Sequence, residues 1–204
     1  MSYRNNMSIA GLVVLGVPLL IGIYGVSTYN SLVRSDQQVQ SQWAQVENVY
    51  QRREDLVPNL VATVKGAAGF EKSTYTAVAE ARAKVGQVSA SSLTNPANAP
   101  AQFAQFQQAQ NGLSSALSRL MVVVERYPDL KATENFRDLQ AQLEGTENRI
   151  AVERMRFNEV AQTFNSKRDS FPTTLVANLS GARFQEKSYF KAQVQAEAAP
   201  QVKF

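Results

Sequence analysis

The sequence predicts an all-α protein in which an N-terminal transmembrane helix is followed by an up-and-down (antiparallel) four-helix bundle with long, coiled-coil-like helices. Three observations predict it: an uncharged apolar segment near the N-terminus, apolar residues that recur every seven positions, and Gly or Pro residues between these stretches. The 204 residues suit an anchor and one core. We divide them into a tail and anchor (1–28), a bundle (29–180) and a C-terminal tail with an aromatic patch (181–204).

The predicted anchor has its apolar core at residues 9–26, which is long enough to cross a bilayer as a helix. Tyr24, near the end of the apolar stretch, and Tyr29, just beyond it, are expected at the membrane interface, where amphipathic rings are enriched. The alternative is a cleaved signal peptide with its cleavage site at residues 25–27, but the apolar run exceeds the usual length of such a peptide. We therefore expect a single-pass membrane protein.

The first bundle helix carries apolar side chains on two lines of a heptad lattice, which places them on one stripe. These residues are Leu32, Val39, Val46 and Leu60 on one line, and Trp43, Tyr50, Val57 and Val64 on the other. Asp36 and Arg53 interrupt the stripe with charges. Lys65 and Gly66 predict the end of the helix, because a cation and a glycine are typical of helix C-termini. The alternative is a helix that continues to Val88.

The remaining helices are predicted by the same spacing and by their breakers. The expected order is a helix at about 70–88, a loop at 89–100, a third helix from about 101 that ends before Pro128, a fourth helix capped near Thr133, and a short helix at 173–179. The fourth helix has the most regular stripe: Phe136, Leu143, Ile150, Phe157 and Phe164. Phe171 and Pro172 end it.

Arg53 needs a partner in this bundle, because an unpaired charge inside a helical core is costly. If the first helix turns at Gly66, the fourth helix descends beside the first, and counting from the turn places Glu147 at the height of Arg53. We therefore predict an Arg53–Glu147 pair, with Asn148 or Asn59 able to accept a remaining hydrogen bond. If the first helix does not turn there, Glu153 is the alternative partner.

A stretch of 34 residues, 85–118, carries no charge at all. An uncharged helix face can approach another helix without desolvating charges, so we predict self-association through Phe103, Gln105 and Gln108. The alternative is a neutral helix and loop that face solvent.

The composition argues against catalysis. The chain has no His and no Cys, which removes the commonest general base, the thiol nucleophiles and the usual zinc ligands. We expect no catalytic, cofactor-binding or metal-binding residues and no enzyme activity. The net charge of +4 comes from interspersed basic and acidic residues, so nucleic acid is not an expected partner.

The C-terminal tail suggests a second hypothesis, in which the protein binds or shapes the bilayer surface. Residues 181–191 combine Phe184, Tyr189 and Phe190 with three basic side chains, as interfacial amphipathic segments do.

Six short motifs in order resemble the LemA family of bacterial membrane-anchored proteins. They are YNSLV at 29–33, RREDLVPNLV at 52–61, VKG at 64–66, AR at 81–82, YPDLK at 127–131 and TENRIA at 146–151. The resemblance covers nearly the whole chain. It implies a membrane helix followed by a four-helix bundle, in a family without an established biochemical activity. Family members usually carry a His shortly after the Lys-Gly pair, where this chain has Phe70.

Taken with the residue-level observations, the resemblance leads us to expect a membrane-anchored scaffold that acts through protein contacts and forms homo-oligomers. Its expected partners are membrane lipid around the N-terminal helix and an unidentified protein. Arg4 on one side of the anchor is balanced against Arg34 and Asp36 on the other. This weak asymmetry favours an N-terminus inside the bacterial cell and a bundle outside the cytoplasm.

Overall fold

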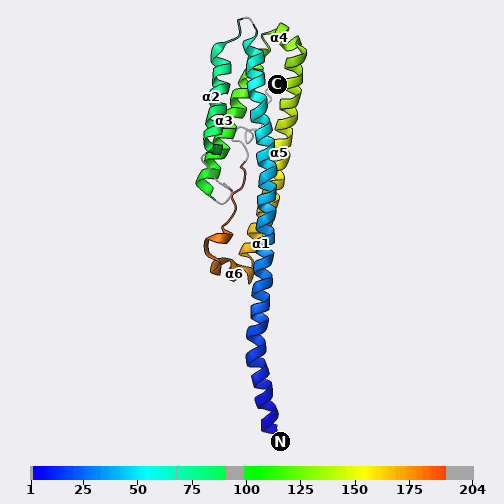
Figure 1. The fold of residues 1–204 in the computed structure, drawn as a ribbon, viewed down its shortest axis with the longest axis vertical. Coiled ribbons are helices and arrows are strands. Elements are labelled where there is room, and N and C mark those ends of the chain that lie inside the picture. Colours follow the sequence, from blue (N-terminus) through cyan, green and yellow to red (C-terminus); the bar gives the residue numbers. More distant parts are fainter. Residues whose placement is uncertain (1, 68, 91–98, 192–204) are drawn as a thin grey trace, which may run out of the picture.

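The computed structural model describes residues 2–67, 69–90 and 99–191, with side chains from residue 15 onward except at residues 89 and 90. Its long helices are α1 (Ser2–Lys65), α2 (Lys72–Ala90), α3 (Pro100–Val124) and α5 (Glu134–Asp169). They run alternately up and down as a bundle, and the first part of α1 extends alone beyond it (Figure 1). The predicted all-α, antiparallel four-helix architecture is confirmed.

The apolar N-terminal part of α1 is the one candidate membrane span among the described residues. From Leu15 onward, α1 contains an 18-residue window with a mean hydropathy of 1.2, and only 11% of that window is buried. Leu19, Leu20 and Ile21 are exposed side chains of this part. Water is a poor solvent for such a surface, whereas lipid is a good one.

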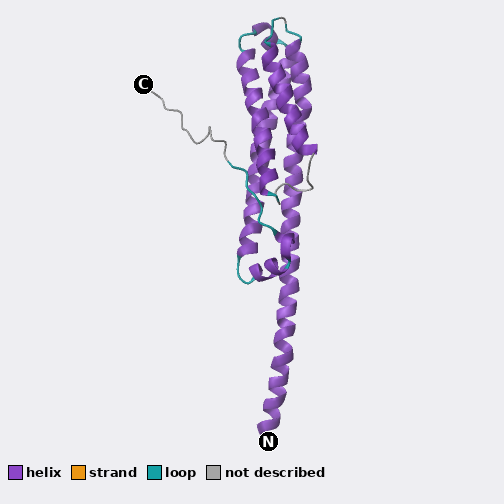
Figure 2. Ribbon diagram, turned by 90° about the vertical axis from the view of Figure 1, so that its left-hand side faces the viewer, coloured by secondary structure: helices purple, strands orange, loops and turns teal. Residues whose placement is uncertain are grey.

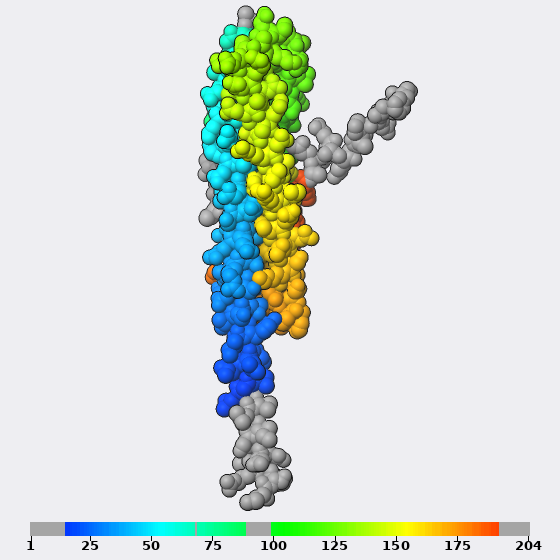
Figure 3. Space-filling view, turned by 90° about the vertical axis from the view of Figure 1, so that its right-hand side faces the viewer, coloured from blue at the N-terminus to red at the C-terminus, as the bar shows by residue number. Residues whose placement is uncertain are grey.

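The bundle part of α1 buries the predicted stripe, including Leu32, Trp43 and Val57. The helix ends at Lys65, where the Gly66 amide donates to the carbonyls of Ala62 and Thr63, each at 3.2 Å. The predicted turn at Gly66 is therefore present, and the alternative of a helix continuing to Val88 is wrong. α1 and α5 then pack against each other along the length of the bundle (Figure 3).

α3 begins with Pro100 in its first turn, a position at which the missing amide hydrogen is harmless. The predicted tight connection around Pro128 contains a single helical turn, α4 (Pro128–Ala132). Thr133 caps α5 as predicted, because its Oγ1 accepts a hydrogen bond from the Phe136 amide at 3.4 Å. The predicted loop at 89–100 falls mostly outside the described residues.

The chain after α5 forms α6 (Thr173–Leu179), with the predicted bounds, and the short helix η2 (Gly181–Phe184). Residues 185–191, which we call the C-terminal strap, then lead back up along the bundle (Figure 2). The sequence assigned these residues to a tail separate from the bundle. In the structure Phe184 and Phe190 are buried in the core, so the bundle continues to the end of the strap.

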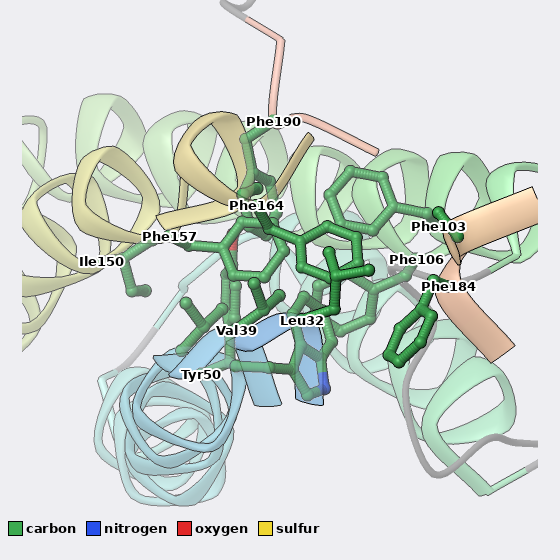
Figure 4. Close-up of a cluster of buried hydrophobic side chains, with 14 residues drawn as sticks. Leu32, Val39, Tyr50, Phe103, Phe106, Ile150, Phe157, Phe164, Phe184 and Phe190 are labelled. Carbon is green, nitrogen blue, oxygen red and sulfur yellow. The ribbon is translucent and has the colours of Figure 1, made fainter. Parts of the chain in front are cut away.

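The core consists of two clusters stacked along the bundle axis. The membrane-proximal cluster surrounds Trp43, Phe157 and Phe164 and contains residues of the strap. Figure 4 shows its side chains converging from α1, α3, α5 and the C-terminal segment. The distal cluster surrounds Leu60, Leu120 and Phe136. Arg53 lies between Tyr50 of the first cluster and Val57 of the second, and it forms a polar layer at their boundary.

Candidate functional site

The polar layer consists of Arg53, Gln110, Ser114 and Glu147, which come from α1, α3 and α5. Arg53 is 1% exposed. Its Nη1 donates to Ser114 Oγ at 2.7 Å and to Glu147 Oε1 at 2.9 Å. Its Nη2 donates to the Gln110 carbonyl at 3.3 Å and to the Gln110 side-chain oxygen. The forked guanidinium therefore ties three helices together at one level.

The structure brings together the pair that the sequence predicted. Arg53 and Glu147 form an ion pair because the turn at Gly66 sets the register of α1 against α5 as the counting assumed. Glu153, the alternative partner, instead accepts hydrogen bonds from Gln42 at 2.6 Å and Arg156 at 2.8 Å. The other acceptors of Arg53 are Gln110 and Ser114 on α3, where the sequence suggested Asn148 or Asn59.

Burial of this arginine is compensated on several sides. Glu147 is 39% exposed, so one end of the ion pair stays solvated and its desolvation is incomplete. The Arg53 guanidinium also lies over the Tyr50 ring, 5.0 Å from its centroid, which adds a cation–π contact. The layer therefore pairs a charge inside the bundle, although Nε of Arg53 is buried without a hydrogen-bond partner, and it fixes the relative heights of α1, α3 and α5.

Two titratable groups beside the layer are perturbed. Burial raises the pKa of the Glu54 carboxyl above its ordinary value of 4.5, although a hydrogen bond from Gln110 and the charges of Arg53 and Arg82 oppose the shift. Burial also raises the pKa of Tyr50 above 10.0, against the charges of Arg154 and Arg53. Perturbed groups can mark catalytic sites, but a buried ion-pair network produces the same effect.

The layer offers little to a cofactor. Within the part of the chain whose side chains are described, no three acidic side chains gather closely enough to hold a metal ion. The Ser114 hydroxyl accepts from Arg53, and the chain has no His, the commonest general base for activating such a hydroxyl. Its groups chiefly hydrogen-bond one another, which suits a structural role.

The C-terminal strap is held by a second polar arrangement that the sequence did not reveal. Asn158 accepts from the Phe190 amide at 2.9 Å and donates to the Phe190 carbonyl at 3.0 Å. Asn165 holds both backbone groups of Lys187 in the same way, each at 2.9 Å. The two asparagines are seven residues apart on α5, so they lie on one face and bind an extended chain as a neighbouring strand would.

Side chains complete the attachment of the strap. The Lys187 Nζ lies 2.5 Å from Asp36 Oδ1 of α1 and 4.7 Å from the centroid of the Phe164 ring. Phe190 stacks on Trp43, with 6.1 Å between ring centroids, and meets Phe157 edge-on at 5.5 Å. Both charges in the α1 stripe, Asp36 and Arg53, are thus paired across the bundle. The sequence did contain one signal for the attachment of the strap: Asn158 and Asn165 are seven residues apart, and each directly follows a residue of the α5 core stripe.

Of the three residues predicted to form the self-association face, only two are exposed on the surface. Phe103 is 3% exposed and packs against Trp43, so its place in that face was wrong. The heptad lattice points it into the core, as it does Phe106. Gln105 and Gln108 are exposed and line a groove of about 880 Å³ between α2 and α3, together with Ala81 and Gly112. Two of the three residues therefore remain available to a partner.

Of the aromatic residues predicted at the membrane interface or in contact with lipid, some are exposed and others are buried. Tyr24 is exposed on the lone part of α1, whereas Tyr29 packs edge-on against Phe184 at 5.5 Å, beneath the Arg183 guanidinium. Phe184 and Phe190, proposed to touch lipid, are buried. Tyr189, the third aromatic of the segment 181–191, is exposed, so one of its three aromatic side chains is presented as the sequence suggested.

The YPDLK family motif lies at a structural joint between α3 and α5. Tyr127, which opens the YPDLK motif, donates from its hydroxyl to the Gly69 carbonyl at 2.8 Å. Its ring lies 4.9 Å from that of Phe70, the residue near the place of the usual His. Phe70 is buried and belongs to the distal cluster. At this position the chain therefore closes the bundle with an apolar contact.

These features define a class of protein: an antiparallel helical bundle with an apolar helical extension and a buried polar layer that joins its helices. The sequence model of the LemA family matches residues 42–204, and the chain belongs to this family. The expected family membership is confirmed.

Curated relatives show how far the similarity extends. The chain is 27% identical over 179 residues to "Magnetosome protein MamQ 2" of Paramagnetospirillum magneticum, covering 80% of this chain and 64% of that protein. It is 27% identical over 178 residues to "Magnetosome protein MamQ" of Magnetospirillum gryphiswaldense, with coverage of 79% and 64%. "Protein LemA" of Metamycoplasma hominis is 25% identical over 162 residues, with coverage of 78% and 69%. The chain spans less than two thirds of the MamQ proteins.

Proposed function

We propose that the chain is a membrane-anchored, non-enzymatic scaffold that acts through protein contacts, including contacts with its own copies. The observation that carries this proposal is the continuity of α1 from Ser2 to Lys65. One helix joins an exposed apolar segment directly to the core, so membrane lipid is the partner of its first part. The bundle then stands on the anchor as a rigid rod.

The non-enzymatic part of the proposal rests on the polar layer. Its hydrogen bonds run chiefly among Arg53, Gln110, Ser114 and Glu147 themselves, and Arg53 is fully enclosed. Catalysis would require a nucleophile, a base and a space between them in which a substrate could bind. The layer instead holds helices in register, which is what a scaffold requires.

Self-association is supported by the groove between α2 and α3. Gln105, Gln108 and Gly112 line one wall of the groove from a stretch of sequence that contains no charge. A second helix can pack against this uncharged part of the α3 wall without desolvating an ion. The charged residues of the groove are Arg119, beyond the uncharged stretch, and Glu80 and Lys84 on α2. We place the contact between copies there, while a different protein partner remains compatible with the same surface.

The test of self-association is the mass of the full chain in detergent, measured by mass photometry. The wild-type protein should run as an oligomer, and the double variant Gln105→Lys with Gln108→Lys should shift towards the monomer. The matched control is Gln45→Lys with Gln142→Lys, which adds the same charge at exposed glutamines of α1 and α5. A wild-type monomer at micromolar concentration, or equal shifts in both variants, would reject the proposed face.

We place the bundle outside the cytoplasm of the bacterial cell, on the weak charge asymmetry around the anchor. Because the chain has no cysteine, a single Gln142→Cys variant provides a clean probe of topology. A membrane-impermeant thiol reagent should label it in cells whose outer barrier is permeabilised. If labelling occurs only after lysis of the inner membrane, the bundle lies in the cytoplasm and the proposed topology is wrong.

A further inference from the structure

The base of the bundle exposes three large apolar side chains in sequence. Phe171 is 81% exposed, Leu175 54% and Leu179 89%, and they follow one another at intervals of four residues through the turn after α5 and along α6. We call these three residues the apolar foot. The other side of α6 is packed, since Ala177 is buried in the proximal cluster. A folded chain rarely leaves such a group to water without an interaction that uses it.

The apolar foot lies where α1 leaves the bundle. Lys167 on α5 donates to the Ser31 carbonyl at 3.2 Å and to Ser35 Oγ at 3.0 Å, which fixes the local register of the two helices. α5 continues past Lys167 to Asp169, about 3 Å closer to the anchor, and Phe171 follows two residues beyond the end of the helix. The edge-on contact between Tyr29 and Phe184, five residues after Leu179, places this base beside Tyr29 of α1. Figure 1 shows α6 at this end of the bundle, beside α1.

The part of α1 just below this level is exposed and apolar. Ile23 and Val26 belong to the candidate membrane span, and Val26 is three residues before Tyr29. The hydrocarbon core of a bilayer is about 30 Å thick and is flanked by interfacial layers several Å deep. If α1 crosses a bilayer up to about Val26, the apolar foot lies in the interfacial layer of the same leaflet.

Nearby charges match that environment. Arg183 is exposed, and its guanidinium lies 5.3 Å from the centroid of the Tyr29 ring. Arg168 is partly exposed and pairs with Asp169 at the end of α5. Basic groups above an apolar surface are typical of segments that lie in the membrane interface, because the cations reach phosphate while the apolar groups reach acyl chains.

We infer that the apolar foot inserts into the surface of the membrane that α1 crosses, so that the bundle is attached at two points. This inference rests on the proposed membrane anchor. A single helix would let the bundle tilt about its exit point, whereas a second contact beside it restricts that tilt. These residues differ from the three aromatics that the sequence suggested. Phe184 is buried at this base against Tyr29, Phe190 is buried higher in the bundle against Trp43, and Tyr189 is exposed.

The experiment uses the full chain, which has no cysteine, in phosphatidylcholine vesicles containing phosphatidylglycerol. Three single variants, Leu179→Cys, Ile21→Cys and Gln142→Cys, receive an environment-sensitive fluorophore. Lipids with a nitroxide near the headgroup then serve as quenchers. Leu179 should show a blue-shifted emission and quenching by these lipids, while Gln142, exposed on α5 in the distal half of the bundle, should show neither. Phe171→Ser with Leu175→Ser should abolish the quenching at Leu179.

The three labelled positions distinguish failure of the apolar foot from failure of the membrane anchor. Quenching at Ile21 from nitroxides deep in the acyl chains, without any at Leu179, would overturn the apolar foot and leave the anchor intact. Absence of quenching at both would refute the anchor and the foot together. A blue shift at Leu179 that lipid nitroxides do not quench, and that disappears when the protein is diluted in lipid, would mean that a second copy covers the foot. That result would also overturn the inference.

Discussion

The ammonium group of Lys187 lies 2.5 Å from Oδ1 of Asp36, and the Lys187 side chain is fully buried while Asp36 is 15% exposed. The contact joins the C-terminal strap to the first bundle helix. It forms only if the strap lies in place, because Asn165 positions the Lys187 backbone with hydrogen bonds to both its amide and its carbonyl. The end of the chain is therefore part of the fold.

Replacing Asp36 by Asn should destabilise the protein by about 3–5 kcal/mol, because the Lys187 ammonium would stay buried without its carboxylate. Chemical denaturation of the detergent-solubilised chain measures the change. The matched control is the surface pair of Lys131 and Glu125, also at 2.5 Å but exposed at both ends. Glu125→Gln should cost about 0–1 kcal/mol. Equal effects at the two pairs would mean that the strap does not bury Lys187 in solution.

A double-mutant cycle on Arg53 and Glu147 tests the polar layer. Arg53→Met with Glu147→Gln should reveal a coupling energy of about 1 kcal/mol or more, because the two groups share a hydrogen bond at 2.9 Å. Arg53→Met alone should cost about 2–4 kcal/mol, since it leaves Gln110 and Ser114 without their donor. Arg52→Met, at the adjacent exposed position, should stay within about 0.5 kcal/mol. A coupling near zero would contradict the pair.

The proximal core is tested at Phe157, which is fully buried between Trp43, Phe103 and Phe190. Phe157→Ala should lower the free energy of unfolding by about 3–5 kcal/mol, because a ring-sized cavity would remain in a rigid cluster. Val152→Ala on the exposed side of α5 is the control and should change it by less than about 0.5 kcal/mol. A loss below about 1 kcal/mol at Phe157 would mean that the cluster is not packed in solution.

The residues show why the sequence predicted one ion pair and missed the other. Arg53 and Glu147 lie on helices whose register follows from heptads and from one turn, so counting placed them together. Asp36 is on the same stripe, but its partner lies on an extended strap without periodicity. The path of that strap depends on Asn158 and Asn165, whose pairing with backbone groups leaves no pattern in the strap itself.

Phe103 and the apolar foot show a second limit of prediction from the sequence, which concerns the side chains that face outward. An uncharged stretch of sequence does not say which of its side chains face outward, whereas the heptad lattice does, and it places Phe103 in the core. Conversely, aromatic content suggested Phe184, Tyr189 and Phe190 as the surface-exposed group, and of these three only Tyr189 is exposed. The exposed apolar residues are Phe171 and Leu179, because Ala177 and Phe184 take the inward positions when the chain turns at the base. Only tertiary packing decides between these sets.

The last prediction concerns Glu54, which is half-buried beside the polar layer. Burial raises the pKa of its carboxyl above 4.5, so the folded protein binds this proton more tightly than the unfolded chain does. For a raised acidic pKa, the contribution to stability is present below the unfolded value of the pKa. It is lost as the pH rises through the folded value. The ionised carboxylate therefore opposes folding at neutral pH.

Glu54→Gln removes this titration while keeping an amide that can bond with Gln110, whose Nε2 donates to Glu54 Oε1 at 3.5 Å. Its free energy of unfolding should rise relative to wild type as the pH increases from 4 to 7, measured by urea denaturation at each pH. Tyr50→Phe is the control: because the pKa of Tyr50 is raised above 10.0, its difference from wild type should stay constant over this range. A Glu54→Gln difference that falls with pH would mean that Arg53 and Arg82 stabilise the carboxylate more than burial opposes it. The pKa of Glu54 would then be lowered in the folded protein.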